Sequence, residues 1–324
     1  MKILITGASG YIGSIIYNYL KKNFTVFGLD KKKSQSKKII NCNLKDKNRI
    51  NKIIKEISPN LIIHLAGQSL VDQTISRKKY INNNILATKN LLKAMKSNGI
   101  NNLIFSSTAA VYKFTNNKLN ELSKIEAKSN YAKTKLECEN IIKKSRINSI
   151  ILRFFNVCSS IRINKNIFGE FHNPETHLIP TAVYKNIIKK KIYLYGNNYK
   201  TKDGTCIRDY IHIKDICESI KKSIKFLIYK KNRFEVINIG SNITYTNFEI
   251  LKRIEKITGI KNKVKFIKKR SGDVDKLNCS INKAKKILNW RPINSKIDKI
   301  IKDEIIFVKK LIKDKRYRKF KNYL

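Results

Sequence analysis

In the first part of the chain, short apolar runs alternate with longer segments that have one apolar face. The apolar runs predict buried strands at Lys2–Thr6, Thr25–Leu29, Leu61–Leu65, Leu103–Ser106 and Ser149–Phe154. The segments between them have the spacing of amphipathic helices, at Ile12–Lys22, Lys47–Ile57, Tyr80–Asn98 and Tyr131–Ser145. This alternation predicts βαβ units and an α/β fold with a Rossmann-type doubly wound parallel sheet. Ligands of such sheets bind beyond the carboxyl ends of the strands.

The pattern becomes less regular after about residue 156. A polar loop is predicted over Ser159–His177 and a helix over Leu178–Lys189. The Gly- and Asp-bearing stretch Tyr195–Asp209 predicts a loop or a hairpin, and the apolar run Val236–Gly240 predicts one more strand of the main sheet.

These patterns predict two interleaved domains. Residues 1–157 form the dinucleotide-binding domain, and residues 158–324 form a smaller mixed α/β domain for the substrate. The segment of about 209–240 is expected to return to the first domain.

A glycine turn directly follows the first predicted strand. Gly7, Gly10 and Gly13 are spaced Gly-x-x-Gly-x-x-Gly, and an amphipathic helix begins at the turn. Glycines let backbone N–H groups approach a pyrophosphate closely, and the helix N-terminus adds a positive dipole. The next strand ends in Asp30, where a carboxylate accepts a hydrogen bond from a ribose hydroxyl. Strand, turn, helix and acid together predict a dinucleotide site.

The net charge is unusually high. The chain has 70 Lys and Arg residues against 23 Asp and Glu, which gives a formal net charge of +47. Because the basic residues are spread along the chain, we interpret the charge as a compositional bias and expect no nucleic-acid partner. A general positive field also attracts anionic nucleotides, although it gives no specificity.

Cysteine and histidine usage indicates neither disulfides nor a metal. The six cysteines contain no Cys-x-x-Cys pair, so we expect reduced thiols and a cytoplasmic protein. No apolar run reaches the roughly 20 residues of a membrane span. Of the four histidines, His64 and His212 lie in apolar strand-like runs that are typical of a core, and we predict no metal site.

A tyrosine and a lysine are the candidate catalytic residues. Tyr131 and Lys135 lie at i and i+4 on one helical face. A free tyrosine has a pKa of about 10, but a nearby ammonium and a cationic nicotinamide favour the phenolate and lower that pKa. The hydroxyls of Ser106, Ser107 and Thr108 follow a strand, where they can hold a substrate oxygen. A poised base beside a hydride acceptor is suited to alcohol oxidation.

The chain resembles the extended short-chain dehydrogenase/reductases and, within them, the UDP-glucose 4-epimerases. The turn and the Tyr/Lys pair carry the first resemblance. The second rests on motifs of the later part of the chain, among which Asp203–His212 (Asp-Gly-Thr-Cys-Ile-Arg-Asp-Tyr-Ile-His) is the most specific. The other motifs are Arg153–Val157, Asn173–Pro180, Tyr195–Tyr199, Asn238–Gly240, Arg270–Asp273 and Leu288–Pro292.

The resemblance implies a role for each matching residue. Tyr131 is the acid/base, Lys135 tunes its pKa and contacts the ribose, and Thr108 contacts the sugar 4-oxygen. NAD is the implied cofactor, held by Gly7, Gly10, Tyr11, Ile12, Gly13, Asp30, Asn43, Leu44, Ala66, Asn84, Ser106 and Phe155 together with the Tyr/Lys pair. The UDP-sugar is held by Thr108, Asn156, His177, Leu178, Tyr193, Tyr195, Arg208, Arg270 and Asp273.

Two positions depart from the family pattern. Asn43 stands where an Asp usually lies beside the adenine, and Ser69 stands where some relatives have a lysine near the NAD phosphate. The first departure weakens one expected cofactor contact.

The activity implied is the interconversion of UDP-galactose and UDP-glucose through a 4-keto sugar by a homodimer. A 4,6-dehydratase needs an acidic pair after the active threonine, and Ala109 and Ala110 stand there instead. Epimerases of a UDP-N-acetylhexosamine or a UDP-pentose, and a nucleotide-sugar reductase, stay as alternatives. Leu277, four residues after Asp273, is the candidate residue beside the sugar 2-substituent.

Overall fold

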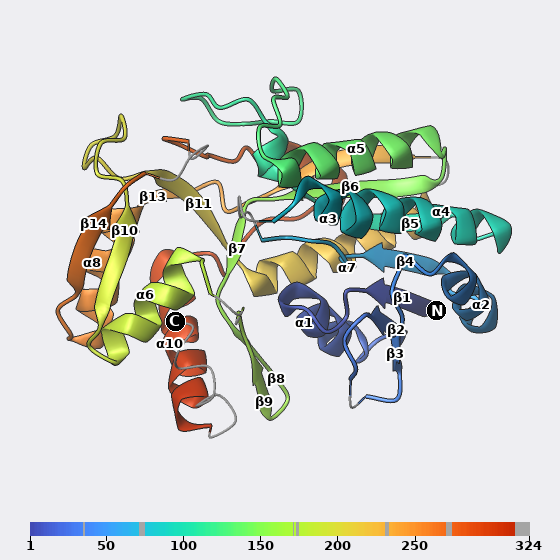
Figure 1. Cartoon of the computed structure of the whole chain (residues 1–324), viewed down its shortest axis with the longest axis horizontal. Helices are drawn as coiled ribbons and strands as arrows, with labels where there is room; N and C mark the ends of the chain where they lie inside the picture. Colours follow the sequence, from blue (N-terminus) through green and yellow to red (C-terminus); the bar gives the residue numbers. More distant parts are fainter. Residues whose placement is uncertain are drawn as a thin grey trace.

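A parallel sheet of seven strands forms the larger half of the computed structural model (Figure 1). The structure describes residues 1–34, 36–70, 75–170, 172, 175–230, 233–269 and 274–314. The strand order is β12-β6-β5-β4-β1-β2-β3, and every neighbouring pair is parallel. The bounds are β1 (Lys2–Thr6), β2 (Thr25–Asp30), β3 (Ile39–Asn41), β4 (Leu61–His64), β5 (Asn102–Thr108), β6 (Asn148–Phe154) and β12 (Phe234–Ile239). The predicted doubly wound parallel sheet is confirmed.

Helices cover both faces of this sheet. One face carries α1 (Tyr11–Leu20), α7 (Ile213–Tyr229) and α9 (Asn282–Leu288), and the other carries α2 (Lys47–Ile57), α4 (Ala87–Ser97) and α5 (Asn130–Lys144). Each helix buries an apolar stripe: Ile16 and Ile220 are fully buried on the first face, and Ile50 and Leu91 on the second. Burying one apolar face of each helix on the apolar strands is the main source of stability here.

The predicted first-half elements agree with the structure to within two residues, with two exceptions. The short edge strand β3 was missed, because three residues give too little alternation. The predicted helix Tyr80–Asn98 is interrupted: α3 (Arg77–Tyr80) is followed by a π-helical segment η1 (Ile81–Leu86) and then by α4. Such π-segments are frequent at functional sites.

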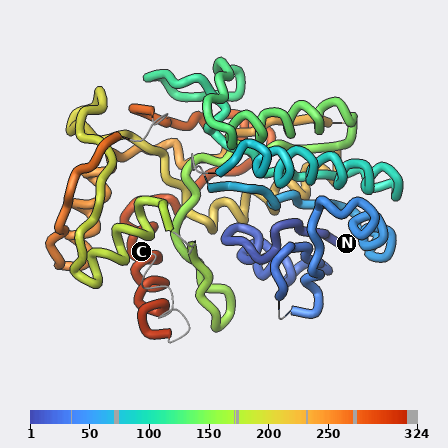
Figure 2. The backbone as a smooth tube through the Cα atoms, in the orientation of Figure 1, coloured from blue at the N-terminus to red at the C-terminus, as the bar shows by residue number. Residues whose placement is uncertain are grey.

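The smaller half contains a two-stranded parallel sheet, a three-stranded mixed sheet and its own core. Figure 2 follows the chain from the sheet half, at the right, into this half, at the left. Strands β10 and β14 pair in parallel, while β13, β11 and β7 form a mixed sheet around a core with α6, α8 and α10. The bounds are β7 (Asn156–Cys158), β10 (Lys191–Tyr195), β11 (Ile207–His212), β13 (Thr244–Thr246), β14 (Lys263–Ile267), α6 (Leu178–Ile187), α8 (Asn247–Thr258) and α10 (Ile297–Lys313).

Two second-half predictions are confirmed and one is wrong. The run at Val236–Gly240 lies in β12, which joins the main sheet beside β6, and α6 matches the predicted helix. The predicted polar loop Ser159–His177 instead contains a hairpin of β8 (Ile161–Ile163) and β9 (Asn166–Phe168). Its turn has Asn164 at a φ of 55°, a conformation that asparagine tolerates. Strands of three residues leave too short a pattern to read.

The stretch Tyr195–Asp209 was predicted as a loop or a hairpin. Residues 196–206 are a loop, but β11 begins at Ile207, and β10 and β11 do not pair with each other. The hairpin alternative is therefore wrong. Gly204 has a φ of 73°, and a side chain there would meet the Asn197 carbonyl oxygen at 2.2 Å, so this loop requires glycine.

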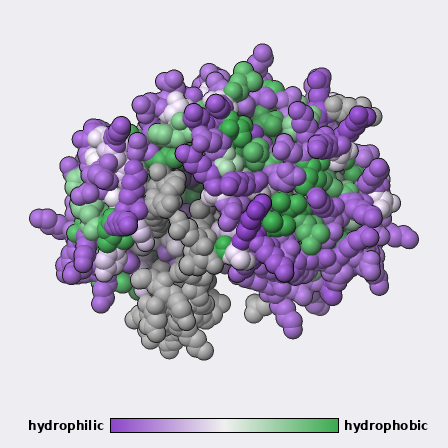
Figure 3. Space-filling model, turned by 45° about the horizontal axis from the view of Figure 1, so that its top comes forward, coloured by the Kyte–Doolittle hydropathy of each residue, from purple (hydrophilic) through white to green (hydrophobic). Residues whose placement is uncertain are grey.

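The surface follows the composition. Figure 3 shows hydrophilic residues over most of one face, with smaller hydrophobic areas between them. None of the described helices is both long enough and apolar enough to cross a membrane. All six cysteines are buried free thiols.

Candidate active site

The glycine turn is closely packed against α1 and the β4 end. Gly7 has a φ of 74°, and a Cβ there would lie 2.8 Å from the Ala66 nitrogen. A Cβ on Gly13 would lie 2.0 Å from the Gly7 carbonyl oxygen, so α1 can approach the turn only with glycine there. Gly10 is the N-cap of α1, whose first turn carries no acidic residue. This end of the helix therefore offers N–H groups and a positive dipole to an anion.

Tyr11 and Ile12, the first residues of α1, have different environments. The Tyr11 hydroxyl donates a hydrogen bond of 2.6 Å to the Ser159 carbonyl oxygen, and its ring makes an edge contact with His172 at 6.3 Å. Burial, followed by the negative charge of Glu170, raises the pKa of Tyr11 well above its usual value. Ile12 packs against the main core. Tyr11 thus joins the glycine turn to the second half of the chain.

Asp30 lies beside the turn, as expected of a ribose ligand. Its carboxylate accepts hydrogen bonds of 2.9 Å from the backbone N–H groups of Ser9 and Lys32. Asn43 is exposed and accepts a hydrogen bond from the Lys45 backbone, and Leu44 is buried against the core. A pocket of about 410 Å³ lies at this end, lined by Lys31, Asn43, Lys45, Ser76, Lys78, Lys79, Asn82 and Asn83.

Asn84 joins three elements at the expected nicotinamide end. From η1, its Oδ1 accepts from the Gln68 backbone at 2.7 Å, and its Nδ2 donates to the Thr134 hydroxyl on α5 at 2.9 Å. Thr134 precedes Lys135, so the π-helical segment positions the helix that carries the Tyr/Lys pair. The Ala66 backbone donates to the Thr6 hydroxyl, and the Ser106 hydroxyl donates to the His64 carbonyl oxygen.

The candidate catalytic side chains meet at the carboxyl end of β5. Tyr131 is in the first turn of α5, whose N-cap Ser129 accepts from the Ala132 backbone at 3.1 Å. Tyr131 lies beside Thr108, the last residue of β5, close enough for the Thr108 side chain to affect its pKa. Lys135 follows one turn later and is buried, with its Nζ 4.3 Å from the centre of the Phe105 ring.

The predicted lowering of the Tyr131 pKa is wrong for the protein alone. Burial raises the pKa of Tyr131 to about 12, and the Thr108 side chain only partly opposes this. Burial lowers the pKa of Lys135 to about 8, against the charges of Cys138 and Glu139. Desolvation disfavours the charged form of each group and outweighs these opposing contributions.

The strand register brings two more predicted residues to the same edge. Thr108 on β5 is paired with Phe154, the last residue of β6. Phe155 follows and is buried, and its N–H donates to the Ile239 carbonyl oxygen of β12. Asn156 begins β7 and donates to the Asp209 carbonyl oxygen of β11 at 2.9 Å.

Arg208 is on β11, next to Asp209. Its Nη1 donates to the carbonyl oxygens of Ile207 at 2.9 Å and Val274 at 2.8 Å, which fixes the direction of the guanidinium. Arg270 and Asp273, the other expected UDP ligands of this region, lie outside the described residues.

The remaining predicted sugar-nucleotide residues lie on α6 and β10. Leu178 begins α6, and His177 is its N-cap residue. Tyr193 and Tyr195 are on the exposed side of β10, and the Lys185 ammonium lies 5.0 Å from the Tyr193 ring. In Figure 1, β10 lies at the left, in the smaller half of the molecule, and α5 lies over the main sheet.

A buried ion pair behind the Tyr/Lys pair was missed by the sequence analysis. Glu139 accepts from the Arg153 Nε at 3.0 Å and from its Nη2 at 2.6 Å, and both side chains are buried. Ser107, beside Thr108, also donates to Glu139. The pair ties α5 to β5 and β6. No local sequence signal shows that residues 139 and 153 meet.

Asp209 was also missed, although it lies inside the most specific motif. It is fully buried and accepts from the Ser241 backbone at 2.6 Å, the Asn242 backbone at 2.9 Å and the Cys279 backbone at 3.3 Å. Burial raises the pKa of Asp209 to about 6, against these hydrogen bonds. The residue fastens two loops to β11.

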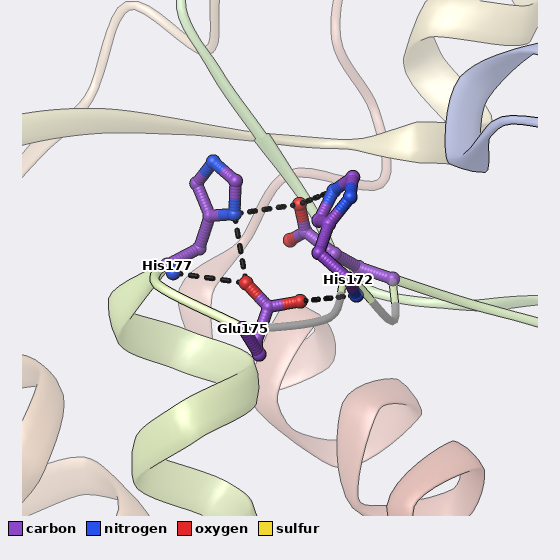
Figure 4. Close-up of side chains that lie close together, drawn as sticks. His172, Glu175 and His177 are labelled. Carbon is purple, nitrogen blue, oxygen red and sulfur yellow. Dashed lines mark hydrogen bonds and ion pairs between the residues drawn. The ribbon is translucent and has the colours of Figure 1, made fainter. Parts of the chain in front are cut away.

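Two of the four histidines meet two glutamates between β9 and α6. His177 Nδ1 lies 2.8 Å from Glu175 and 3.1 Å from Glu170, and His172 Nε2 lies 3.2 Å from Glu170 (Figure 4). Burial, followed by the negative charges of Glu170 and Glu175, raises the pKa of Glu304 on α10 well above its usual value, so this carboxyl lies nearby. The spacing of residues 170, 172, 175 and 177 is the signal that could have found the cluster.

Comparison with known proteins agrees with this geometry. Residues 3–240 match the NAD dependent epimerase/dehydratase family. The chain belongs to this family. A family member, the UDP-glucose 4-epimerase of Lactobacillus helveticus, is 32% identical over 316 residues, covering 93% of this chain and 95% of that protein.

Solved structures show the same architecture. The UDP-glucose 4-epimerase from Brucella ovis in complex with NAD superimposes with a TM-score of 0.86 at 27% identity, covering 95% of this chain and 98% of that one. The UDP-Glc/GlcNAc 4-epimerase from Campylobacter jejuni has a TM-score of 0.79 at 27% identity, covering 95% and 99%.

Proposed function

We propose that this family member is an NAD-dependent UDP-hexose 4-epimerase, an isomerase that interconverts UDP-galactose and UDP-glucose. The observation that carries the proposal is the position of Tyr131 beside Thr108 at the carboxyl end of β5, with Lys135 one helical turn away. The activities named for the similar proteins support it.

The turn and its surroundings fit NAD. The packing that excludes a Cβ at Gly7 and Gly13 brings the α1 N-terminus against the turn, which suits a pyrophosphate. Asp30 lies beside the turn to bind the adenosine ribose, and Asn84 and Phe155 lie on the elements around the Tyr/Lys pair. When bound, NAD supplies a hydride acceptor that later returns the hydride.

In the proposed mechanism, Tyr131 removes the proton of the sugar C4 hydroxyl while C4 loses hydride, which leaves a 4-keto sugar. Thr108 holds the 4-oxygen. Because burial raises the pKa of Tyr131, positive charge nearby is needed to favour its phenolate. Lys135, one turn away on α5, is the proposed source, and bound oxidised NAD would add to it. Tyr131 then returns the proton when C4 regains hydride on its opposite face, so no redox partner is consumed.

Sugar rotation requires that the protein hold the UDP and not the reacting carbon. Arg208, Asn156 and His177 are the proposed anchors in the described part of the chain, since they lie on β11, β7 and the α6 N-terminus. Binding energy away from C4 keeps the nucleotide in place while the keto sugar turns.

The direct test is to incubate the pure protein with UDP-galactose and no added cofactor, and to follow UDP-glucose. We expect UDP-glucose to form without net NADH. An oxidised sugar with one NADH per turnover would indicate an oxidoreductase, and a 4-keto-6-deoxy sugar would indicate a dehydratase. Either result would contradict the proposal.

We expect NAD, not NADP, in the cofactor extracted from the purified protein. The Asp30 carboxylate would repel a 2′-phosphate, although Lys31 to Lys33 lie next to it. Asp30→Asn should lower the ratio of the affinity for NAD to the affinity for NADP by at least about tenfold, because it removes the repulsion between the carboxylate and the 2′-phosphate. Asp46→Asn, at the N-cap of α2, is the matched control. Mostly NADP in the wild-type extract would contradict this assignment.

Leu277 gives a second specificity prediction. Its N–H donates to the Ile207 carbonyl oxygen at 2.9 Å, and its side chain packs partly against the main core. If it borders the sugar 2-substituent, Leu277→Tyr should lower the efficiency for UDP-N-acetylglucosamine relative to UDP-glucose by about 10–200-fold. The measurement is the ratio of the two kcat/KM values. An unchanged ratio would show that Leu277 is only a packing residue.

Three further assignments stay proposals. The domain division near residue 157 is supported by the separate core of α6, α8 and α10, and limited proteolysis tests it. The homodimer rests on the sequence resemblance, and sedimentation equilibrium tests it. The cytoplasmic location is supported by the six free thiols, and fractionation of the source cells tests it.

A further inference from the structure

The cluster between β9 and α6 has the donor set of a transition-metal site. One ligand atom from each of Glu170, His172, Glu175 and His177 lies within 4.8 Å of all the others. Tetrahedral zinc ligands at about 2.0–2.1 Å from the metal lie about 3.3 Å from each other. The three donor separations given by the structure are 2.8, 3.1 and 3.2 Å.

A second observation is the presence of buried carboxylate oxygens with no partner. Glu170 is 3% exposed, and its Oε2 accepts no hydrogen bond. Glu304 is fully buried, and neither of its carboxyl oxygens has a partner. Because burial favours the neutral form of Glu304, its bare oxygens need no counter-charge. The bare Oε2 of Glu170, which belongs to the cluster, marks a place for a further bonding partner.

The missing group is not a basic side chain. The chain has 70 Lys and Arg residues, yet no ion pair between the described residues joins one of them to Glu170, Glu175 or Glu304. Among the described residues, Glu170 and Glu175 are paired only with His172 and His177, and Glu304 is paired with no basic side chain. The absence of a basic side chain from these ion pairs favours a metal ion as the positive group.

We propose that Glu170, His172, Glu175 and His177 bind one divalent transition-metal ion, with Zn²⁺ the best fit. Two carboxylates and two imidazoles form a donor set that zinc accepts, and the two carboxylates balance its charge. His177 Nδ1 lies 2.8 Å from Glu175 and binds the ion as a nitrogen free of its proton.

The surroundings of the cluster suit a metal site. The backbone N–H groups of Thr176 and His177 each donate to Glu175 Oε1 at 2.9 Å, and the His172 N–H donates to its Oε2 at 2.9 Å. Such bonds orient a ligating carboxylate. The His177 side chain is about half exposed, which gives an ion a path into the site.

The ion would hold the chain between the glycine turn and α6. His172 contacts the Tyr11 ring in the first turn of α1, and His177 is the N-cap residue of α6. In Figure 4 the second ring nitrogen of His177 points away from Glu175. If the proposed function holds, His177 also contacts the UDP-sugar, and the metal would fix the position of its imidazole.

The test is metal binding by the full-length protein, purified without a polyhistidine tag. The protein is stripped with EDTA, dialysed and titrated with ZnCl₂ by calorimetry, and metal content is measured by mass spectrometry. We expect one Zn²⁺ per chain and a higher Tm with Zn²⁺. Glu170→Gln and His172→Gln should each weaken binding by at least about 10–100-fold, the loss caused even by residues that only support a ligand.

Glu249→Gln is the matched control. Glu249 pairs with Lys202 and caps α8, so its loss perturbs the fold mildly but removes no proposed ligand. This variant should still bind one Zn²⁺. The proposal is overturned if the wild type binds no Zn²⁺, since the cluster is then a hydrogen-bond network alone. It is also overturned if the folded Glu170→Gln and His172→Gln variants bind Zn²⁺ as tightly as the wild type. Neither result bears on the UDP-galactose assay.

Discussion

Tyr131→Phe is expected to lower epimerase turnover by about two to four orders of magnitude, the usual contribution of a positioned acid/base. Tyr131 lies beside Thr108, and no other described hydroxyl takes its place on α5 one turn before Lys135. Turnover of UDP-galactose is measured at saturating substrate. Release of NAD from the denatured variant shows whether the cofactor is retained.

Tyr80→Phe is the control for this prediction. Tyr80 is a buried tyrosine close enough to Tyr131 to raise its pKa, and its own hydroxyl donates to the Leu70 carbonyl oxygen at 2.6 Å. Loss of one neutral hydrogen bond is worth about 1 kcal/mol, so turnover should stay within about fivefold of wild type. Near-wild-type turnover in Tyr131→Phe would rule out Tyr131 as the base.

Glu139→Ala is expected to lower the free energy of unfolding by about 3–5 kcal/mol. The substitution leaves the Arg153 guanidinium buried without its bidentate partner and removes the acceptor of the Ser107 hydroxyl. Since domains are stable by only about 5–15 kcal/mol, the change should be plain in a urea denaturation curve.

Two further variants test whether the loss of stability comes from an unpaired buried charge or simply from the loss of any charged pair. Glu126→Gln removes an exposed pair with Lys128 at 3.6 Å and should cost less than about 1 kcal/mol. The double variant Glu139→Leu with Arg153→Met replaces both charges by apolar groups and should regain most of the loss. A single-variant cost no larger than that of Glu126→Gln would contradict the assigned role of the pair.

The sequence was sufficient to predict features that are formed by residues close to one another in the chain. The glycine turn, the strand end at Asp30 and the Tyr131/Lys135 spacing are local patterns, and the parallel sheet they predict places them at one edge. Local spacing fixes which side chains share a helical face or follow a strand.

The sequence did not predict properties that depend on burial or on contacts between residues distant in the chain. Burial, which raises the pKa of Tyr131 to about 12, depends on everything packed around the side chain. The three-residue strands of the β8–β9 hairpin are stabilised by pairing, and their pattern is too short to be read.

By itself, then, the sequence determined the doubly wound sheet, the glycine turn after β1 and the Tyr131/Lys135 spacing on α5, because periodicity and turn residues are local features of the chain. Only the tertiary structure decided that Glu139 meets Arg153, that Asn84 reaches Thr134, and that Glu304 approaches the cluster of Glu170. These contacts join residues that are 14, 50 and 134 positions apart. Chain folding brings such residues together through the burial of apolar surface, which is not directional and leaves no spacing in the sequence to read.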